Sequence, residues 1–383
     1  MRLRHAITLL RPAREAARCP DLQATAGTVR AVPPSPVSSR AASDHLEGST
    51  PPQVSVVVST RDRAALLGGL LEALEAQSFG LDRFEVVVID DGSRDDTWTR
   101  IAEVSKVTPL RLLALRLEVS GGQGAGRNVG VEHAHAPVVA FTDDDCLPTP
   151  SWLETLTRPL RSSDGSGTAE AGHLVVQGRT VPWPGDADAG TWARTVWVLR
   201  ATWLFETCNI AYRKRDLQNA GGFPERDQVT TTGSGKVVGE DAMLGWRAIE
   251  QGASLVFDED ALVHHRRIPA SYSQWLAQRR GALVFPALCA RNPMARRALW
   301  GHFFLAPRSA AFDLAVAGGL VFAATRRARW LSALLPWVWL ALPEAARYPG
   351  RHPGVRLGQL ALGDLIGFTW LVAGSVRSRS VVL

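Results

Sequence analysis

The sequence predicts an α/β fold with a mainly parallel sheet flanked by helices. Short runs rich in Val and Ile lie at residues 53–60, 84–90 and 138–141, and they show too little polar alternation for the strands of an exposed sheet. Segments whose apolar residues have helical spacing separate these runs. At 383 residues, the chain can hold one large domain and an accessory region.

The elements of the first half follow the order of a parallel sheet with right-handed crossovers. Leucines at helical spacing predict the first helix, and glycines mark the turn before the third. The predicted elements are a strand at 53–60, a helix from Arg63 to Gln77, a strand at 84–90, a helix beginning near Asp95, a strand from Leu110 to Leu115, a turn and helix at 121–134, and a strand at 138–141.

The second half is less regular. A strand is expected at 173–181, and a helix capped by Gly252 precedes one or two short strands that end near His265. Residues 226–238 are rich in Thr and Gly, and we expect a mobile loop that orders when substrate binds. Several tryptophans in this half are typical of core or membrane-interface positions, and none is assigned to a site.

Composition divides the chain into three parts. Residues 1–50 are rich in Arg, Ala, Pro and Ser, and we expect them to be mostly disordered. Residues 51–285 form the predicted α/β domain, with a first half at 51–150 and a second half at 151–285. Residues 286–383 form a helical region with three apolar stretches, at 309–325, 331–343 and 357–374.

The apolar stretches of the C-terminal region leave two possibilities open. None is an uninterrupted span of about 20 uncharged residues. We favour helices embedded in or lying on a membrane, and the alternative is helices packed on the α/β domain. Arg326, Arg327 and Arg329 separate the first two stretches and could lie at a cytoplasmic leaflet.

The charge of the chain suits an anionic partner. The formal net charge is +6 and the isoelectric point is about 9.6, which favours a nucleotide diphosphate or an acidic lipid surface. We expect no nucleic-acid partner. The four cysteines lie too far apart in sequence for the close-paired spacing of a zinc site or a disulfide framework, which indicates a reducing compartment. No convincing signal peptide is present, so translocation is not indicated.

Three consecutive carboxylates, Asp143, Asp144 and Asp145, follow the strand at 138–141. Open parallel sheets bind ligands at the carboxyl ends of their strands. Two unit charges about 4 Å apart repel by about 4 kcal/mol at an effective dielectric near 20, so a half-buried trio requires a counter-charge. A divalent cation that carries a phosphorylated substrate fits best. The alternative is a solvated acidic turn before Pro148.

Two other strand ends carry candidate nucleotide contacts. Thr60 and Arg63 follow the first strand, where they can meet a nucleotide, and Asp90 or Asp91 could accept a hydrogen bond from a base N–H group. The alternative for Asp91 is a turn-forming role before Gly92, which is chemically sufficient by itself.

A glycine-rich segment precedes Arg127, at the start of the predicted third helix. Glycine permits close backbone approach, and a helix N-terminus attracts phosphate. The pattern GGQGAG fits neither the P-loop nor the GxGxxG motif, and a plain flexible loop is the alternative.

Together these motifs resemble the family 2 glycosyltransferases, which have the GT-A fold. No single motif decides this, but all of them occur in the family's order between residue 53 and about residue 275. The motifs are VSVVVSTRDR, VVVIDDGSRDDT, GAGRNVG, FTDDDCLP, NIAYRKRDLQNAGGF, GEDAMLGWR and ALVHHRRIPAS.

The resemblance implies a role for each acidic strand end. The family's D-x-D pattern maps onto Asp143 and Asp145, which an extended chain would aim to one side. We expect Asp145 to bind Mg²⁺ or Mn²⁺, with Asp143 at the ribose or in the ligand shell and Asp144 between them. The resemblance also implies a nucleotide or phosphate contact by Arg127, and base recognition near Asp91.

A histidine of the family's pattern falls on His264 or His265, slightly favouring His265. One imidazole could join the metal and shift the preference toward Mn²⁺, while the alternative is that one histidine packs inside and the other faces water. Glu240 and Asp241 begin a helix after Gly239, a position that the helix dipole alone favours by roughly 0.3 to 1 kcal/mol. The resemblance instead implies that Asp241 is the general base of an inverting transfer.

The sequence therefore predicts a metal-dependent, inverting glycosyltransferase that uses a nucleoside-diphosphate sugar. The acceptor would be a saccharide, a lipid-linked molecule or a small molecule with a hydroxyl group, and the enzyme would act on the cytoplasmic face of the cell membrane. One alternative is a non-catalytic, membrane-bound sugar-nucleotide binder. A sugar-nucleotide pyrophosphorylase is a second, but STRDRAALLGG matches the basic glycine-rich signature of that class poorly.

Overall fold

The computed structural model describes residues 8–10, 36–46, 50–161, 173–224, 230–231, 237–346 and 352–383. The strands are β1 (Thr8–Leu10), β2 (Val37–Ala42), β3 (Val54–Thr60), β4 (Phe84–Asp90), β5 (Leu112–Leu117), β6 (Val138–Phe141), β7 (Cys146–Pro148), β8 (Leu174–Pro182), β9 (Ile210–Arg213), β10 (Thr230–Thr231), β11 (Val237–Val238) and β12 (Ser254–His265).

The α-helices are α1 (Ala64–Glu75), α2 (Thr97–Val104), α3 (Gln123–His133), α4 (Trp152–Arg161), α5 (Lys214–Asn219), α6 (Glu240–Glu250), α7 (Tyr272–Gln278), α8 (Val284–Arg291), α9 (Pro307–Thr325), α10 (Leu335–Ala346) and α11 (Pro353–Ser378). Four 3₁₀ helices accompany them: η1 (Pro184–Asp186), η2 (Arg279–Leu283), η3 (Pro293–Ala298) and η4 (Ala328–Leu334).

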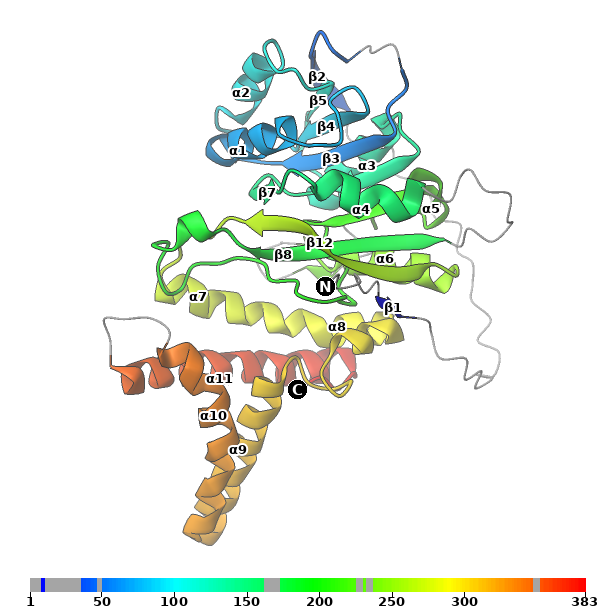
Figure 1. Cartoon of the computed structure of the whole chain (residues 1–383). Helices are drawn as coiled ribbons and strands as arrows, with labels where there is room; N and C mark the ends of the chain where they lie inside the picture. Colours follow the sequence, from blue (N-terminus) through cyan, green and yellow to red (C-terminus); the bar gives the residue numbers. More distant parts are fainter. Residues whose placement is uncertain are drawn as a thin grey trace, which may run out of the picture.

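One large mixed sheet organises the molecule (Figure 1). Its order is β1-β12-β8-β9-β6-β3-β4-β5-β2, and β7 pairs with β12. The strands β6, β3, β4 and β5 run parallel, as the sequence predicts, whereas β9 and β2 pair with them antiparallel. The carboxyl ends of four consecutive parallel strands therefore meet at one edge, where the acidic motifs lie.

Helices cover both faces of the sheet, which explains why its central strands are continuously apolar. Every residue of β3 and β4 is buried. Leucines of α1 and α4 pack on one face, and side chains of α3, α6 and α8 pack on the other. The helix α3 approaches closely because Gly126 and Gly130 face the sheet; a Cβ atom at Gly130 would lie 2.4 Å from Val57 Cγ1.

The N-terminal segment differs from the expectation of disorder. Val37–Ala42 forms the edge strand β2 beside β5, and Thr8–Leu10 pairs with β12. The sequence of β2, VSSRAA, is too polar to predict a buried strand, but an edge strand needs only backbone pairing on one side. The rest of residues 1–50 lies largely outside the described residues.

Several predicted boundaries shift by one or two residues. The first helix begins at Ala64, the second at Thr97, and the third strand covers Leu112–Leu117. The short strands expected before His265 are one strand, β12, whose pairing register with β8 shifts between Asp258 and Leu262. The loop predicted at 226–238 lies mostly outside the described residues. Its expected mobility therefore stays a prediction.

The three apolar stretches of the C-terminal region are helices. The helices α9 and α10 project together from the body as a hairpin, and α11 lies alongside α8 and η2 (Figure 1). By length and composition, α9 and α11 could each cross a membrane, although two such helices are weak evidence. Residues 326–327 connect α9 to η4, so the arginines of this turn lie at the free end of the hairpin, away from the sheet.

Candidate functional site

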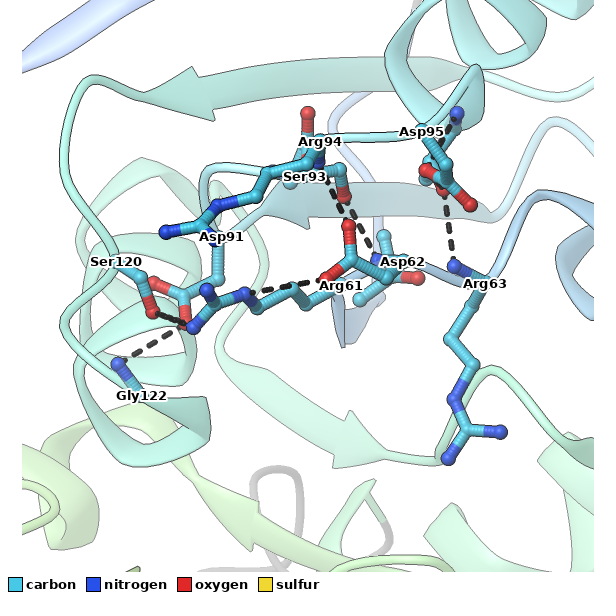
Figure 2. Close-up of polar contacts among 12 residues, drawn as sticks. Arg61, Asp62, Arg63, Asp91, Ser93, Arg94, Asp95, Ser120 and Gly122 are labelled. Carbon is cyan, nitrogen blue, oxygen red and sulfur yellow. Dashed lines mark hydrogen bonds and ion pairs between the residues drawn. The ribbon is translucent and has the colours of Figure 1, made fainter. Parts of the chain in front are cut away.

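The loops that follow β3, β4 and β5 interlock at the carboxyl edge of the sheet (Figure 2). The backbone N–H of Asp62 donates to Ser93 Oγ at 3.0 Å, and the N–H of Arg94 donates to Asp62 Oδ1 at 2.7 Å. Arg61 Nη1 donates to Ser120 Oγ at 2.5 Å. These bonds cross between loops far apart in sequence, so this edge is organised before any ligand binds.

Asp90 and Asp91 differ from the prediction in which of them forms the turn before Gly92. Asp90 Oδ1 accepts from the N–H of Ser93 at 2.9 Å and makes the turn that the sequence assigned to Asp91. The carboxylate of Asp91 accepts instead from Ser120 Oγ and from the N–H groups of Gly121 and Gly122, at 2.7 to 3.0 Å (Figure 2). Both side chains hold loops in place, and base recognition by either one stays a prediction.

Thr60 and Arg63 lie where the sequence expects a nucleotide contact. Thr60 Oγ1 donates to Asp144 Oδ2 at 2.7 Å, so Thr60 fixes one of the strand-end carboxylates. The side chain of Arg63 extends away from the interlocked loops (Figure 2) and forms no ion pair within the described residues. Its positive charge acts on Asp144 and Asp145, where it lowers both pKa values against the effect of burial.

Asp143, Asp144 and Asp145 point to three different partners. The N–H of Cys146 donates to the carbonyl oxygen of Asp143 at 3.1 Å, which closes a turn. The chain turns here and is not extended as the prediction assumed, so a shared direction of Asp143 and Asp145 stays a prediction. Asp143 pairs with Arg127, Asp144 with Thr60, and Asp145 faces His265.

Burial disfavours the negative charges of Asp144 and Asp145, and few positive charges lie close enough to compensate. Desolvation raises the pKa of Asp144 to about 7, and the neighbouring Asp145 and Asp143 add to the shift while the hydrogen bond from Thr60 opposes it. Desolvation also raises the pKa of Asp145, with His265 acting in the opposite direction. A ligand that brings positive charge would therefore be stabilised at this strand end.

The pair formed by Asp145 and His265 fits a divalent cation. Nδ1 of His265 lies 2.8 Å from the carbonyl oxygen of Arg266, which can only accept, so Nδ1 carries the proton. In the neutral imidazole, Nε2 then presents its lone pair to Asp145 Oδ1 at 3.4 Å. Because Asp145 can only accept, this contact is satisfied either by a proton on Nε2 or by a metal ion between the two atoms. A carbonyl that fixes the tautomer is typical of a metal-binding histidine.

Cys146 and His264 take different positions around this pair. The ligand atoms of Asp145, Cys146 and His265 lie within 4.8 Å of one another. Desolvation raises the pKa of the Cys146 thiol well above its ordinary value, so it stays protonated and is a poor ligand for a hard cation. His264 is not in this cluster, because adjacent residues of β12 point to opposite faces. The metal-binding role assigned to His264 therefore has no support.

Arg127 lies at the centre of the site. Its side chain is 2% exposed, and its guanidinium reaches Asp143 Oδ1 at 2.8 Å, Asp241 Oδ1 at 3.2 Å and Glu240 Oε1 at 3.6 Å. Although burial opposes the charge, these carboxylates raise the pKa of Arg127 above its ordinary value. The resemblance assigned Arg127 to a nucleotide or phosphate contact, which stays a prediction; in this structure its guanidinium pairs with three acids.

Asp241 stands at the start of α6 with both carboxylate oxygens held. Oδ1 pairs with Arg127, while Oδ2 accepts from Thr207 Oγ1 at 2.9 Å and from the Thr207 N–H at 3.3 Å. The side chain is 27% exposed, so one face remains open to a reactant. Desolvation raises the pKa of Asp241 even though Arg127 lowers it, which makes this carboxylate a stronger base than an ordinary aspartate.

Two neighbours of the site were missed by the sequence analysis. Thr207 lies outside every motif and is one of many threonines, so no pattern marks it. Cys146 could have been suggested by its position directly after Asp145. Arg127 links Asp143, two residues before Asp145 in the chain, with the predicted base Asp241.

Comparison with known proteins identifies a family. Residues 55–211 match the family model described as Glycosyl transferase family 2. Glycosyltransferase AglE of Haloferax volcanii is 29% identical over 225 residues, which are 58% of this chain and 69% of that protein. Validoxylamine A glucosyltransferase of Streptomyces hygroscopicus is 41% identical over 106 residues, which are 27% of this chain and 25% of that protein. A pre-mycofactocin glycosyltransferase of Mycobacterium tuberculosis is 28% identical over 236 residues, 59% of this chain and 45% of that protein.

Solved structures with a similar trace include two glycosyltransferases. Mannosyltransferase PcManGT from Pyrobaculum calidifontis, solved with GDP-Man and Mn²⁺, has a TM-score of 0.49 and 19% identity, covering 86% of this chain and 88% of that one. S. aureus TarS 1–349, solved with UDP, has a TM-score of 0.45 and 18% identity, covering 86% of this chain and 92% of that one. The chain thus spans most of these structures, but less than half of two of the three relatives above.

Proposed function

Because the chain belongs to glycosyl transferase family 2, we propose that it is a metal-dependent, inverting glycosyltransferase that uses a nucleoside-diphosphate sugar. One observation carries the proposal: Arg127 links the strand-end acid Asp143 to Asp241, the expected base. A metal site and a catalytic base that act on the same small molecule must lie close together, and Asp143 and Asp241 both contact Arg127. The pyrophosphorylase alternative is disfavoured by the family match.

The donor would lie over the interlocked strand ends. Arg63, which has no described ion-pair partner, would contact the diphosphate. Asp145 and His265 would hold Mn²⁺ or Mg²⁺, with Asp143 close by. The bound cation would neutralise the negative charge that grows on the departing diphosphate. The loops fixed by Asp90 and Asp91 would shape the surface for the base and ribose.

Asp241 would take the proton of the acceptor hydroxyl. Its Oδ2 is oriented by Thr207, and Arg127 holds Oδ1, so the carboxylate has one open face and little freedom to rotate. The acceptor oxygen forms its bond to the anomeric carbon as the bond from that carbon to the phosphate oxygen breaks, and the electron pair leaves with the diphosphate. A single displacement inverts the anomeric carbon.

The proposal is tested by offering several nucleotide sugars to the full-length protein with Mn²⁺, with Mg²⁺ and with a chelator. The acceptors are saccharides, lipid-linked sugars and small alcohols. We expect one donor to be used with a metal and none with the chelator, and NMR should find the anomeric configuration of the product inverted. Full turnover in chelator contradicts the metal requirement, and retention contradicts the single displacement.

We also propose that the hairpin of α9 and α10 inserts into a membrane. Small residues such as Ala311, Ala315 and Gly318 lie where its helices meet, together with one large buried side chain, Trp337, whereas many large apolar side chains are exposed. Small residues inside and large residues outside favour a lipid environment over water. At about 1.5 Å per residue, α9 is about 28 Å long, close to the thickness of a bilayer's hydrocarbon core.

The α/β domain would lie on the cytoplasmic face of this membrane. Three described cysteines, Cys146, Cys208 and Cys289, are free thiols, as a reducing compartment favours. In this orientation the arginines of the turn, at the free end of the hairpin, would reach the headgroups of the far leaflet and not those of the cytoplasmic leaflet that the sequence analysis expected. An Arg100→Cys variant should react with an impermeant thiol reagent only after cells are broken. Labelling of intact cells contradicts the orientation.

A further inference from the structure

A cavity of about 810 Å³ lies where the segment after β8 meets the C-terminal helices. Its walls come from the chain around η1 and residues 191–197, from α7, and from α10 and α11. Four tryptophans contribute to its lining, together with two arginines and one glutamate: Trp183, Trp192, Trp197, Trp275, Arg267, Arg356 and Glu344. None of these residues belongs to the site described above.

The cavity adjoins the proposed metal ligand His265. The N–H of Trp183 donates to the carbonyl oxygen of His265 at 2.9 Å, and Thr195 Oγ1 donates to the same oxygen at 3.3 Å. Trp183 and Thr195 both line the cavity. The segment that forms this wall continues to Thr207, which holds Asp241. The cavity is thus tied to the proposed metal ligand by two hydrogen bonds.

Arg356 is a buried cation without a described counter-charge. Its side chain is 93% buried, given an exposed fraction of 7%, and it lines the cavity. Nη2 donates to Thr191 Oγ1 at 2.9 Å, but Nε has no hydrogen-bond partner and no carboxylate pairs with the guanidinium within the described residues. A buried charge that is neither paired nor fully hydrogen-bonded is unfavourable, so this position requires an anion.

The other charges of the cavity do not satisfy Arg356. Arg356 lies in the first turn of α11, where the helix N-terminus adds partial positive charge and the turn contains no acidic residue. Glu344 is the one carboxylate among the described lining residues, and it pairs with Arg308. Arg267, a second cation in the wall, donates to the backbone carbonyls of Asp186 and Ala187. Within the described residues, Arg356 thus has no carboxylate partner in the wall of the cavity.

Aromatic rings form the rest of the wall. Trp192 and Trp275 lie with ring centroids 4.5 Å apart, and the guanidinium carbon of Arg356 lies 5.5 Å from the ring centroid of Trp192. Trp197 is 55% exposed at the cavity. Aromatic faces bind apolar chains and the C–H faces of sugars, while the guanidinium binds phosphate oxygens. The combination suits a ligand that has one anionic group and an apolar part.

We propose that this cavity binds the acceptor substrate and that Arg356 binds a phosphate group of that acceptor. The proposal rests on the proposed function, because it identifies the cavity's occupant as the molecule that receives the sugar. The tryptophans would bind the part of the acceptor next to the phosphate. The phosphate can belong to a lipid headgroup, which the neighbouring hairpin would bring close, or to a water-soluble phosphorylated acceptor.

Binding of simple probes tests the proposal without any nucleotide sugar. Full-length protein is titrated with octyl phosphate, inorganic phosphate and octyl glucoside, and tryptophan fluorescence reports binding. We expect octyl phosphate to bind at least tenfold more tightly than octyl glucoside, and Arg356→Gln to abolish that preference. Arg100→Gln, a matched change at an exposed residue of α2, should leave it intact.

A second variant covers the case in which Arg356→Gln does not fold. Trp197→Ala removes a largely exposed ring, and it should weaken octyl phosphate binding several-fold while inorganic phosphate binding stays the same. Inorganic phosphate that binds as tightly as octyl phosphate identifies the soluble source, and much tighter octyl phosphate identifies the lipid source. Equal affinities of octyl phosphate and octyl glucoside for the parent overturn the proposal, and so does binding that Trp197→Ala leaves unchanged.

The test separates this inference from the proposed function. If no nucleotide sugar is used by the protein but octyl phosphate still binds in an Arg356-dependent manner, the cavity is an anion site and the transfer assignment fails. If transfer proceeds while octyl phosphate neither binds nor competes with the acceptor, the proposed function stands and the acceptor assignment of the cavity fails.

Discussion

The sheet edge and the C-terminal hairpin are packed by opposite rules. In the sheet, large apolar side chains are inside, and the charges at its edge are gathered around one buried cation, Arg127. In the hairpin, alanines and the single tryptophan Trp337 are inside, and large apolar residues such as Leu320, Leu335 and Trp339 are 66% to 79% exposed. One chain therefore contains a region built for water and a region suited to lipid.

The difference shows how each region depends on what surrounds it. The sheet edge is specified by internal partners, since nearly every polar side chain there has a described contact. The outer surface of the hairpin has no such partners, and its stability in water comes from the small interface around Trp337 and Ala341. Changes at the sheet edge should therefore alter chemistry and folding, whereas changes on the outer face of the hairpin should alter only where the protein resides.

Loss of the base should give the largest effect. Asp241→Asn keeps the size of the side chain but removes its ability to accept a proton, and we expect kcat to fall by about 10² to 10⁴. Donor binding, measured by calorimetry, should be nearly unchanged. Asp82→Asn, at an exposed loop, is the matched control. Equal turnover by Asp241→Asn and the parent would rule out Asp241 as the base. Absence of turnover in both would support a non-catalytic binder.

The acid limb of the pH profile tests the same carboxylate. Desolvation raises the pKa of Asp241, so its base form is lost as pH falls through a value above the ordinary aspartate pKa. Below that value kcat should decrease about tenfold per pH unit, because the fraction of ionised carboxylate decreases tenfold. The profile is measured with saturating donor and metal. An acid limb at or below the ordinary aspartate value contradicts the environment described for Asp241.

Removal of the central cation should reduce stability. Arg127→Met leaves Asp143, Glu240 and Asp241 near one another without their shared positive charge, and we expect the free energy of unfolding to fall by about 3 to 5 kcal/mol. Denaturant unfolding measures the change. Arg100→Met, which breaks an exposed ion pair, should cost less than about 1 kcal/mol. Similar losses in both variants would show that Arg127 does not organise the acids.

Two adjacent glycines of α9 test the inner packing of the hairpin. A Cβ atom at Gly318 would lie 2.4 Å from Ala333 Cβ and 2.7 Å from the carbonyl oxygen of Trp330, whereas nothing lies within 4 Å of the same atom at Gly319. Gly318→Ala should destabilise the chain by about 1 to 3 kcal/mol. Gly319→Ala should be neutral or stabilise by up to about 1 kcal/mol, because alanine favours a helix. Equal effects in thermal melts would contradict this packing.

Charges on the outer face of the hairpin should have the smallest effect on folding. Leu335→Asp and Trp339→Asp replace exposed side chains, so the unfolding free energy should change by less than about 0.5 kcal/mol. Flotation with lipid vesicles should nevertheless be lost in the double variant. Val107→Asp, at an exposed position of the α/β domain, should float like the parent. Unchanged flotation of the double variant would refute membrane insertion by this face.

The sequence could predict the strands of the sheet because buried parallel strands are continuous apolar runs, as Val54–Thr60 and Phe84–Asp90 are. It could also place the acids at the strand ends. Which acid faces which partner depends on turns and register. The turn at Asp143–Cys146 replaces the extended chain that the sequence analysis assumed. The strand pleat directs His265, and not His264, toward Asp145.

The central position of Arg127 could not be found from local patterns. Its partners Asp143 and Asp241 lie 16 and 114 residues away in the chain, and they meet only because α3 and α6 cover the same face of the sheet. The edge strand β2 was not predicted for a related reason: its sequence is polar, and only its pairing with β5 identifies it as a strand. Arg356 is likewise an ordinary arginine until α11 buries it beside the tryptophans.

Metal binding at Asp145 and His265 is the most direct test of the account. Calorimetric titration of Mn²⁺ into the full-length protein with a nucleoside diphosphate should give one site. That site should be lost in Asp145→Asn and His265→Gln and retained in Asp82→Asn. A Mn²⁺ site that Asp145→Asn and His265→Gln retain, or nucleoside diphosphate that binds the parent as tightly with chelator as with Mn²⁺, would contradict the claim that a cation at this strand end holds the donor.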